Sequence, residues 1–150
     1  MRMKTVEKSD AAPDPLAHLL GYHLRRLSVV VMADLTEALC PLGLKPADAS
    51  VLFMIEANPG ITQSDVGKAL GILRANMAPL IAGLLGRGFI EREPVDGRSH
   101  ALRLSAAGAA LCLRAKSAVG RHEDRVFSSL SKGARARMIS QLRALWMERQ

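Results

Sequence analysis

Apolar residues recur at spacings of three and four along the first part of the chain, which is the pattern of helices that bury one face. The first run predicts a helix from about residue 15 to residue 40, with Pro15 in its first turn. A second helix is expected to begin near Pro46 and to stop at the turn formers of residues 58–60. The apolar positions of the first run include Leu16, Leu19, Leu20, Leu24, Leu27, Val30, Val31 and Leu35.

Two shorter helices follow, joined by a tight turn. Thr62 and Asp65 have the spacing of an N-cap residue and an acidic third position, which predicts a helix over residues 63–70. Gly71 ends this helix.

The start of the next helix is open between two interpretations. If Asn76 is the N-cap, Pro79 falls in the first turn, where no intrahelical N–H is needed. If the helix begins at Leu73, Pro79 lies inside it and a local kink is expected. The first interpretation is favoured. The helix extends to about residue 87, and Gly88 stands where a left-handed residue closes a helix.

Beyond that helix the pattern changes from helical to alternating. Residues 89–93 and 100–104 alternate apolar and polar groups, and the segment between them is rich in turn formers, which predicts a two-stranded hairpin. Ser105 caps a helix that extends to about residue 129, and Ser131 opens the last helix. The predicted fold class is mostly α with a small β-hairpin wing.

Composition fits one domain with a helical interior, because 49% of the residues are hydrophobic but only 3% are aromatic. Residues 1–14 carry mixed charges and few large apolar groups, so we expect a flexible tail.

The net charge of +7 and the pI of about 10.1 suit a polyanionic partner such as nucleic acid. Most of the excess follows residue 104, since residues 105–150 hold nine Lys and Arg against three Asp and Glu. Solvated helix faces would give the same excess, so charge alone does not establish DNA binding.

The order of two short helices, a tight turn and a hairpin is that of a winged helix-turn-helix, over residues 46–104. A helix of this size fits the major groove, and an adjoining hairpin reaches phosphates or the minor groove. We expect the helix that begins after Thr62 to brace the helix of about residues 73–87, which reads the bases.

Candidate DNA contacts lie at the starts of these two helices. Arg74 can pair with guanine and Asn76 with adenine, and Ala75 lies on the same exposed front. Thr62, Gln63 and Ser64 can bind phosphate oxygens at a helix N-terminus. The alternatives are that Asn76 is only an N-cap and that Gln63 and Ser64 are ordinary surface residues.

The predicted hairpin tip is Asp96-Gly97-Arg98-Ser99. Asp96 can accept hydrogen bonds that fix the turn, while Arg98 projects toward the negative minor groove and Ser99 lies beside it. The alternative is a solvated turn.

These segments resemble the MarR family of bacterial transcriptional regulators, over about residues 15–148. The resemblance rests on residues 63–71, 80–85 and 88–92, and above all on the stretch from Asp96 to Ser99 that leads to residues 104–108. Two features depart from the family pattern. Gly97 stands where the family often has Arg, and Leu73 and Pro79 replace polar residues common at the head of the recognition helix.

The resemblance implies a homodimer in which residues 15–45 and 105–150 form a helical dimerisation region. It implies that Arg98 is the wing-tip residue and that Asp96 orients it. It further implies a palindromic operator, and a repressor that is released by a small aromatic or phenolic effector or by cysteine oxidation.

An effector pocket is expected in such a dimer between the first, second and fifth helices. Tyr22, His23, Arg26 and Met54 are candidates to line it, and a buried Arg or His would suit a carboxylate. The alternative for all four is ordinary packing or surface exposure.

Cys40 and Cys112 form no CxxC pair, so we expect neither a disulfide framework nor a structural metal site. This cysteine usage fits a protein of the reducing cytoplasm. Cys40 lies near a helix end that would raise a thiol pKa, which argues against redox sensing, and Cys112 is expected to be buried and inert. The chain shows no signal segment and no membrane span, so a soluble cytoplasmic protein without a membrane partner is expected.

No HExxH, GxSxG or GxxxxGK[ST] motif occurs, and the consecutive His122, Glu123 and Asp124 diverge around a helix. An enzyme is therefore not expected, nor is a cofactor. Two alternatives to an effector-released repressor stay open: a winged-helix module that structures DNA non-specifically or binds a protein, and a cysteine-based redox regulator.

Overall fold

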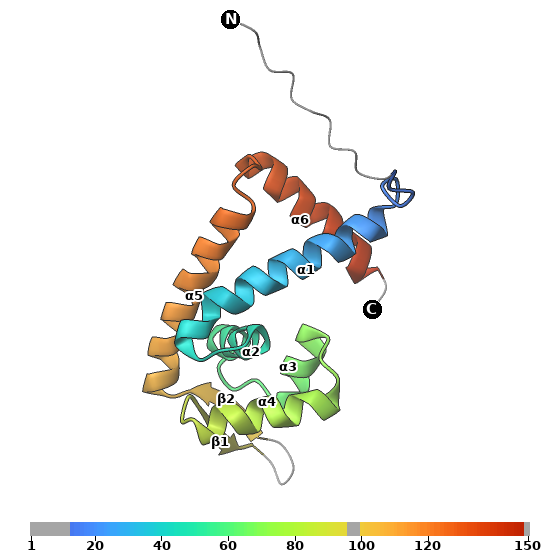
Figure 1. Cartoon of the computed structure of the whole chain (residues 1–150). Coiled ribbons are helices and arrows are strands. Elements are labelled where there is room, and N and C mark those ends of the chain that lie inside the picture. Colours follow the sequence, from blue (N-terminus) through green and yellow to red (C-terminus); the bar gives the residue numbers. More distant parts are fainter. Residues whose placement is uncertain (1–12, 96–99, 149–150) are drawn as a thin grey trace, which may run out of the picture.

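The computed structural model describes residues 13–95 and 100–148 (Figure 1). These residues form mainly helices, with one antiparallel two-stranded hairpin, which confirms the predicted fold class. Residues 1–12 of the expected tail lie outside the described residues. The elements are α1 (Leu20–Leu39), the 3-10 helix η1 (Cys40–Leu42), α2 (Pro46–Ala57), α3 (Gln63–Leu70), α4 (Arg74–Gly86), β1 (Ile90–Pro94), β2 (His100–Leu104), α5 (Ala106–Val126) and α6 (Lys132–Met147).

The expected start of the first helix near residue 15 is wrong, because α1 begins at Leu20. The Asp14 carboxylate accepts a hydrogen bond from the backbone N–H of Leu16 (2.9 Å), which turns the chain locally. Leu19 then has an extended backbone (φ −94°, ψ 116°). Apolar spacing continues through this turn, so periodicity alone placed the helix start too early.

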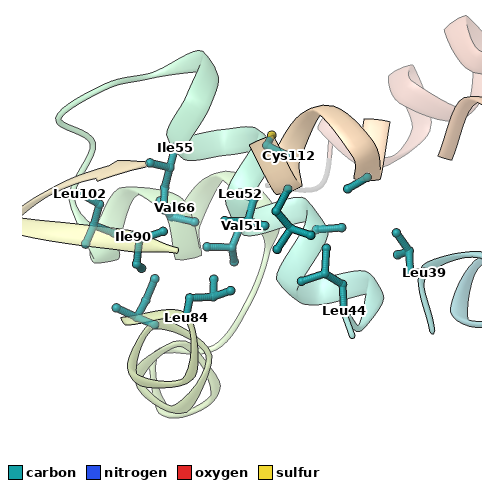
Figure 2. Close-up of a cluster of buried hydrophobic side chains, with 14 of the residues drawn as sticks. Leu39, Leu44, Val51, Leu52, Ile55, Val66, Leu84, Ile90, Leu102 and Cys112 are labelled. Atoms are coloured by element: carbon teal, nitrogen blue, oxygen red, sulfur yellow. The ribbon is translucent and has the colours of Figure 1, made fainter. Parts of the chain in front are cut away.

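The hydrophobic core lies around α2, which contacts α1, α3, α4, α5 and β2. Val51, Leu52 and Ile55 of α2 are buried, and Leu84 of α4 and Leu102 of β2 belong to the same cluster (Figure 2). Aliphatic side chains therefore fill the interior, as the composition predicted.

Backbone hydrogen bonds join the hairpin to the segment before α3. The Leu102 N–H donates to the Ile61 carbonyl (2.9 Å), and the Gly60 N–H donates to the Leu102 carbonyl (3.0 Å). On its other edge β2 pairs with β1, in a register that sets Arg92 opposite Leu102. β2 thus lies between two hydrogen-bonded neighbours, β1 on one edge and residues 60–61 on the other. These bonds hold the start of α3 against the hairpin.

The start of α5 packs directly onto the chain that leaves α4. Ser105 caps α5, because its hydroxyl oxygen accepts from the Gly108 N–H (3.0 Å), and it donates to the Gly88 carbonyl (2.6 Å). A Cβ at Gly108 would lie 1.8 Å from the Phe89 carbonyl oxygen. Only glycine leaves room for this backbone approach.

A polar cluster links α1 to α5. The buried His122 donates from Nδ1 to Asp34 Oδ2 (2.6 Å), and Arg125 donates to the same oxygen (2.6 Å). Arg125 and then His122 lower the pKa of Asp34, so the carboxylate is ionised at neutral pH. The cluster therefore fixes one helix against the other at the level of Asp34.

α6 leaves the end of α5 and buries none of its described side chains (Figure 1). The first half of α1 likewise carries several exposed apolar side chains. Among the described residues no single helix is long and apolar enough to cross a membrane. Large apolar side chains exposed on these helices include Leu20, Leu24, Leu27, Val30, Met138, Ile139, Leu145 and Trp146.

We expect Gly108→Ala to destabilise the fold by about 1–3 kcal/mol, because the new methyl group must displace the Phe89 backbone. Gly120→Ala is the matched control on the same helix. Nothing lies within 4 Å of its Cβ position, so helix propensity should raise stability by up to about 1 kcal/mol. Guanidinium denaturation compares the two variants, and equal midpoints would contradict the close approach.

Candidate nucleic-acid interface

One open groove of about 780 Å³ lies between α3, the start of α4 and the hairpin. Its apolar floor includes Met77 and Leu102, which belong to the core. Its rim is polar, and the charged residues Lys68, Arg74 and Arg92 on it are basic. The polar residues that line it are Thr62, Gln63, Ser64, Lys68, Arg74, Arg92 and His100.

Thr62 is the N-cap of α3, as predicted. Its hydroxyl oxygen accepts from the Asp65 N–H (3.2 Å), and its hydroxyl donates to Asp65 Oδ2 (2.7 Å). The hydroxyl proton is therefore engaged within the cap. The backbone N–H groups of Gln63 and Ser64 belong to the first turn, where a helix leaves its donors without intrahelical partners.

The interpretation of Asn76 as the N-cap of α4 is wrong. α4 begins at Arg74 after Leu73, and the Asn76 N–H already donates to the Leu73 carbonyl (2.9 Å). Pro79 consequently lies inside the helix. The left-handed Gly71 ends α3 with local backbone bonds, because the Gly71 N–H donates to the Lys68 carbonyl (3.2 Å) and the Ile72 N–H donates to the Gly67 carbonyl (2.9 Å). This turn sets the start of α4 without a side-chain cap.

This correction frees Asn76 for another role. Arg74, Ala75 and Asn76 are all exposed in the first turn of α4. No hydrogen bond joins the Asn76 amide to the other residues that the structure describes. Leu73, which is 74% exposed, adds an apolar group beside them.

Sequence reasoning missed three cationic or titratable residues of the groove: Lys68, Arg92 and His100. The place of Arg92 follows from the strand register, which sets it opposite the buried Leu102, because residues opposite one another share a face. Arg92 donates to Gln63 Oε1 (3.4 Å) across the groove.

The hairpin separates its charges by face. Glu91 and Glu93 alternate with Arg92 along β1, so they lie on the opposite face. There Glu93 accepts a hydrogen bond from Arg103 Nε (2.9 Å). Asp65, which does not line the groove, lies near Lys68 (3.8 Å), and Arg74 and Arg92 keep the groove positive.

The wing-tip candidates Asp96, Arg98 and Ser99 lie outside the described residues.

The four effector candidates lie in two parts of the structure. Arg26 donates to the Tyr22 hydroxyl oxygen (2.9 Å), and the Tyr22 hydroxyl donates to Asp14 (3.0 Å) at the exposed start of α1. His23 binds the Ala17 carbonyl (2.7 Å) in the same region. Met54 is instead half-buried on α2 against the core.

A smaller cavity of about 280 Å³ lies between α1 and α5, with Asp34, Glu37, Arg121 and Arg125 in its lining. None of the four effector candidates lines it.

The two cysteines differ in exposure. Cys112 is fully buried, and burial, followed by the nearby Glu56, raises the pKa of its thiol. The neutral thiol is a poor nucleophile, in agreement with the prediction for Cys112. Cys40 is exposed just after α1.

Comparisons with known proteins agree on one family. A MarR family model matches residues 42–99, which run from the end of η1 past β1. The HTH-type transcriptional repressor Rv2887 of Mycobacterium tuberculosis is 30% identical over 114 residues, which are 75% of this chain and 82% of that protein. The chain belongs to the MarR family. The resemblance seen in the sequence is thereby confirmed, and this MarR-family chain is a transcriptional regulator.

Solved structures extend the match over most of the chain. The transcriptional repressor CouR bound to a 23-mer DNA duplex has a TM-score of 0.85 and 39% identity, and covers 91% of this chain and 99% of that one. CouR bound to p-coumaroyl-CoA has a TM-score of 0.79 and 38% identity, and covers 87% of this chain and 93% of that one. Rv2887 in complex with salicylic acid has a TM-score of 0.68 and 28% identity, and covers 92% of this chain and 99% of that one.

We expect Thr62→Ala to lower the free energy of unfolding by about 1 kcal/mol, because it removes the cap of α3. Asn76→Ala should leave stability unchanged or raise it slightly, since Asn76 caps nothing and Ala has the higher helix propensity. Urea denaturation of both variants tests the corrected start of α4. An equal loss in Asn76→Ala would restore the capping interpretation.

Proposed function

We propose that this protein is a homodimeric repressor that occupies a palindromic operator and leaves it when a small aromatic effector binds. The observation that carries the proposal is the exposed first turn of α4 beside a groove whose charged residues are basic, in a chain 39% identical to the DNA-bound repressor CouR. The proposal includes no catalytic step, because the protein acts by occupying DNA. Its proposed site of action is the cytoplasm.

In the proposed complex, residues 46–104 form the DNA-binding region. Arg74, Ala75 and Asn76 enter the major groove, where the guanidinium suits guanine and the free amide suits adenine. The backbone of the first turn of α3 binds phosphate, together with the side chains of Gln63 and Ser64, while Thr62 caps the helix. Asp96, Arg98 and Ser99 are assigned to the wing tip from the sequence.

The second copy covers the apolar faces of α1 and α6. α6 buries no described side chain within its own chain, and Ile139 and Trp146 are more than half exposed. Exposed apolar patches of this kind mark interfaces between subunits. We therefore assign residues 15–45 and 105–150 to dimerisation, which sets two winged lobes at a fixed spacing for a two-fold operator.

The effector is proposed to be an aromatic carboxylic acid or its coenzyme A thioester. CouR binds p-coumaroyl-CoA and Rv2887 binds salicylic acid, according to their solved complexes. In this chain Tyr22 and Arg26 present a phenol and a guanidinium near the apolar face of α1, and His23 lies beside them. The second copy would complete the pocket, with Met54 on its inner side.

Fluorescence anisotropy with DNA from upstream of its own gene tests the proposal. At physiological salt we expect operator affinity at least about 10³-fold above that for an unrelated duplex. Asn76→Ala should lose about 1–3 kcal/mol at one base pair of each half-site. Asn58→Ala, an exposed Asn of the same lobe outside the groove, is the control.

Weak binding that unrelated DNA abolishes would instead favour a non-specific module. If Asn76→Ala weakens binding equally on all sequences, Asn76 does not read a base.

The same assay tests release. Salicylate, p-coumaroyl-CoA and free coenzyme A are added in turn to the operator complex. Release by an aromatic compound but not by free coenzyme A supports the proposed effector class. Release only after peroxide treatment, and its loss in Cys40→Ser, would favour the redox alternative.

Deletion of residues 132–150 should abolish dimerisation, because it removes the apolar face of α6. Ile139→Glu should weaken the dimer without shortening the chain, since it places a charge on that face. Arg137→Glu, a charge change at an exposed site of the same helix, is the control. Sedimentation velocity measures the assembly, and a stable dimer of the shortened chain would contradict the assignment.

A further inference from the structure

Arg92 and Gln63 meet across the groove although 29 residues separate them. Arg92 comes from the middle of β1, and its partner is the first residue of α3. The contact joins the two parts of the proposed DNA-binding surface, the wing and the helix pair.

The backbone places these two residues together. Arg92 stands opposite Leu102, and Leu102 hydrogen-bonds on its other edge to Ile61, two residues before Gln63. The backbone hydrogen bonds that join β1, β2 and the segment before α3 therefore set the distance from β1 to the start of α3. On the same strand Glu93 is bound to Arg103 on the outer face, so it does not compete for Arg92.

The bond determines which end of the Gln63 amide stays available. A Gln side chain carries one carbonyl oxygen that accepts and one NH₂ group that donates. Arg92 donates to Oε1, which leaves the NH₂ group for a partner that accepts. Phosphate oxygens only accept, whereas bidentate recognition of adenine requires the amide oxygen as well.

We propose that Arg92 is a positioning residue that binds the Gln63 amide oxygen so that the amide NH₂ donates to a DNA phosphate. This inference rests on the proposed DNA binding and deepens it. Gln63 then contributes affinity on every sequence and no base preference. Arg92, whose guanidinium lies in the groove, acts on DNA partly through Gln63.

A double-mutant cycle with Arg92→Met, Gln63→Met and the double variant tests this coupling on operator and unrelated duplexes. Met keeps an unbranched apolar side chain over Leu102 and removes the polar group. We expect each single variant to weaken binding to both duplexes by about three- to tenfold. The double variant should bind within about twofold of Arg92→Met alone, because Gln63 has already lost its positioning partner.

Gln63→Glu separates positioning from a purely structural role. Its carboxylate still accepts from Arg92, so thermal stability should be kept, but it has no NH₂ donor and should bind DNA more weakly than Gln63→Met does. Arg103→Met is the matched control, since it removes one wing charge from the outer face. It should change affinity less than Arg92→Met.

Multiplicative losses in the double variant would overturn the positioning role. A changed preference at one base pair in Gln63→Met would overturn the phosphate assignment. Operator preference of the wild-type protein is measured in the same titrations, so its absence would identify failure of the proposed function itself, and the inference would fall with it.

Discussion

The placement of Leu102 is the constraint on which the rest of the DNA-binding lobe depends. Its side chain is fully buried in the core, while its backbone bonds to Gly60 and Ile61 on one edge and β2 pairs with β1 on the other. One residue thus joins the wing, the start of α3 and the interior. The groove has a definite width because these three parts share a strand.

Local signals in the sequence were sufficient for most element boundaries. The caps Thr62, Ser105 and Ser131 are confirmed because each cap is formed by residues no more than three positions apart. Apolar spacing misplaces the starts of α1 and α4, because it does not register the short turns at Asp14 and Gly71 that precede these helices. The spacing of apolar residues therefore predicts that a helix is present better than it predicts the first residue of that helix.

The residues of the candidate site also differ in how far the sequence predicts them. Residues at helix starts could be proposed from the sequence, whereas Arg92 gained its meaning only when strand register set it opposite Leu102 and across from Gln63. The effector residues could not be assembled in this way. Tyr22 is half-buried near the start of α1 and Met54 packs against the core from α2, so the sequence pattern did not show that they lie apart.

A helix that buries nothing in its own chain makes the free subunit an incomplete fold. In the proposed dimer, association with a second copy removes apolar surface of α6 from water, so folding and assembly share one free energy. Apparent stability of the proposed dimer therefore rises with protein concentration. Well below the dimer dissociation constant, occupancy of a two-fold operator grows with the square of subunit concentration, so repression responds steeply to the amount of protein in the cell.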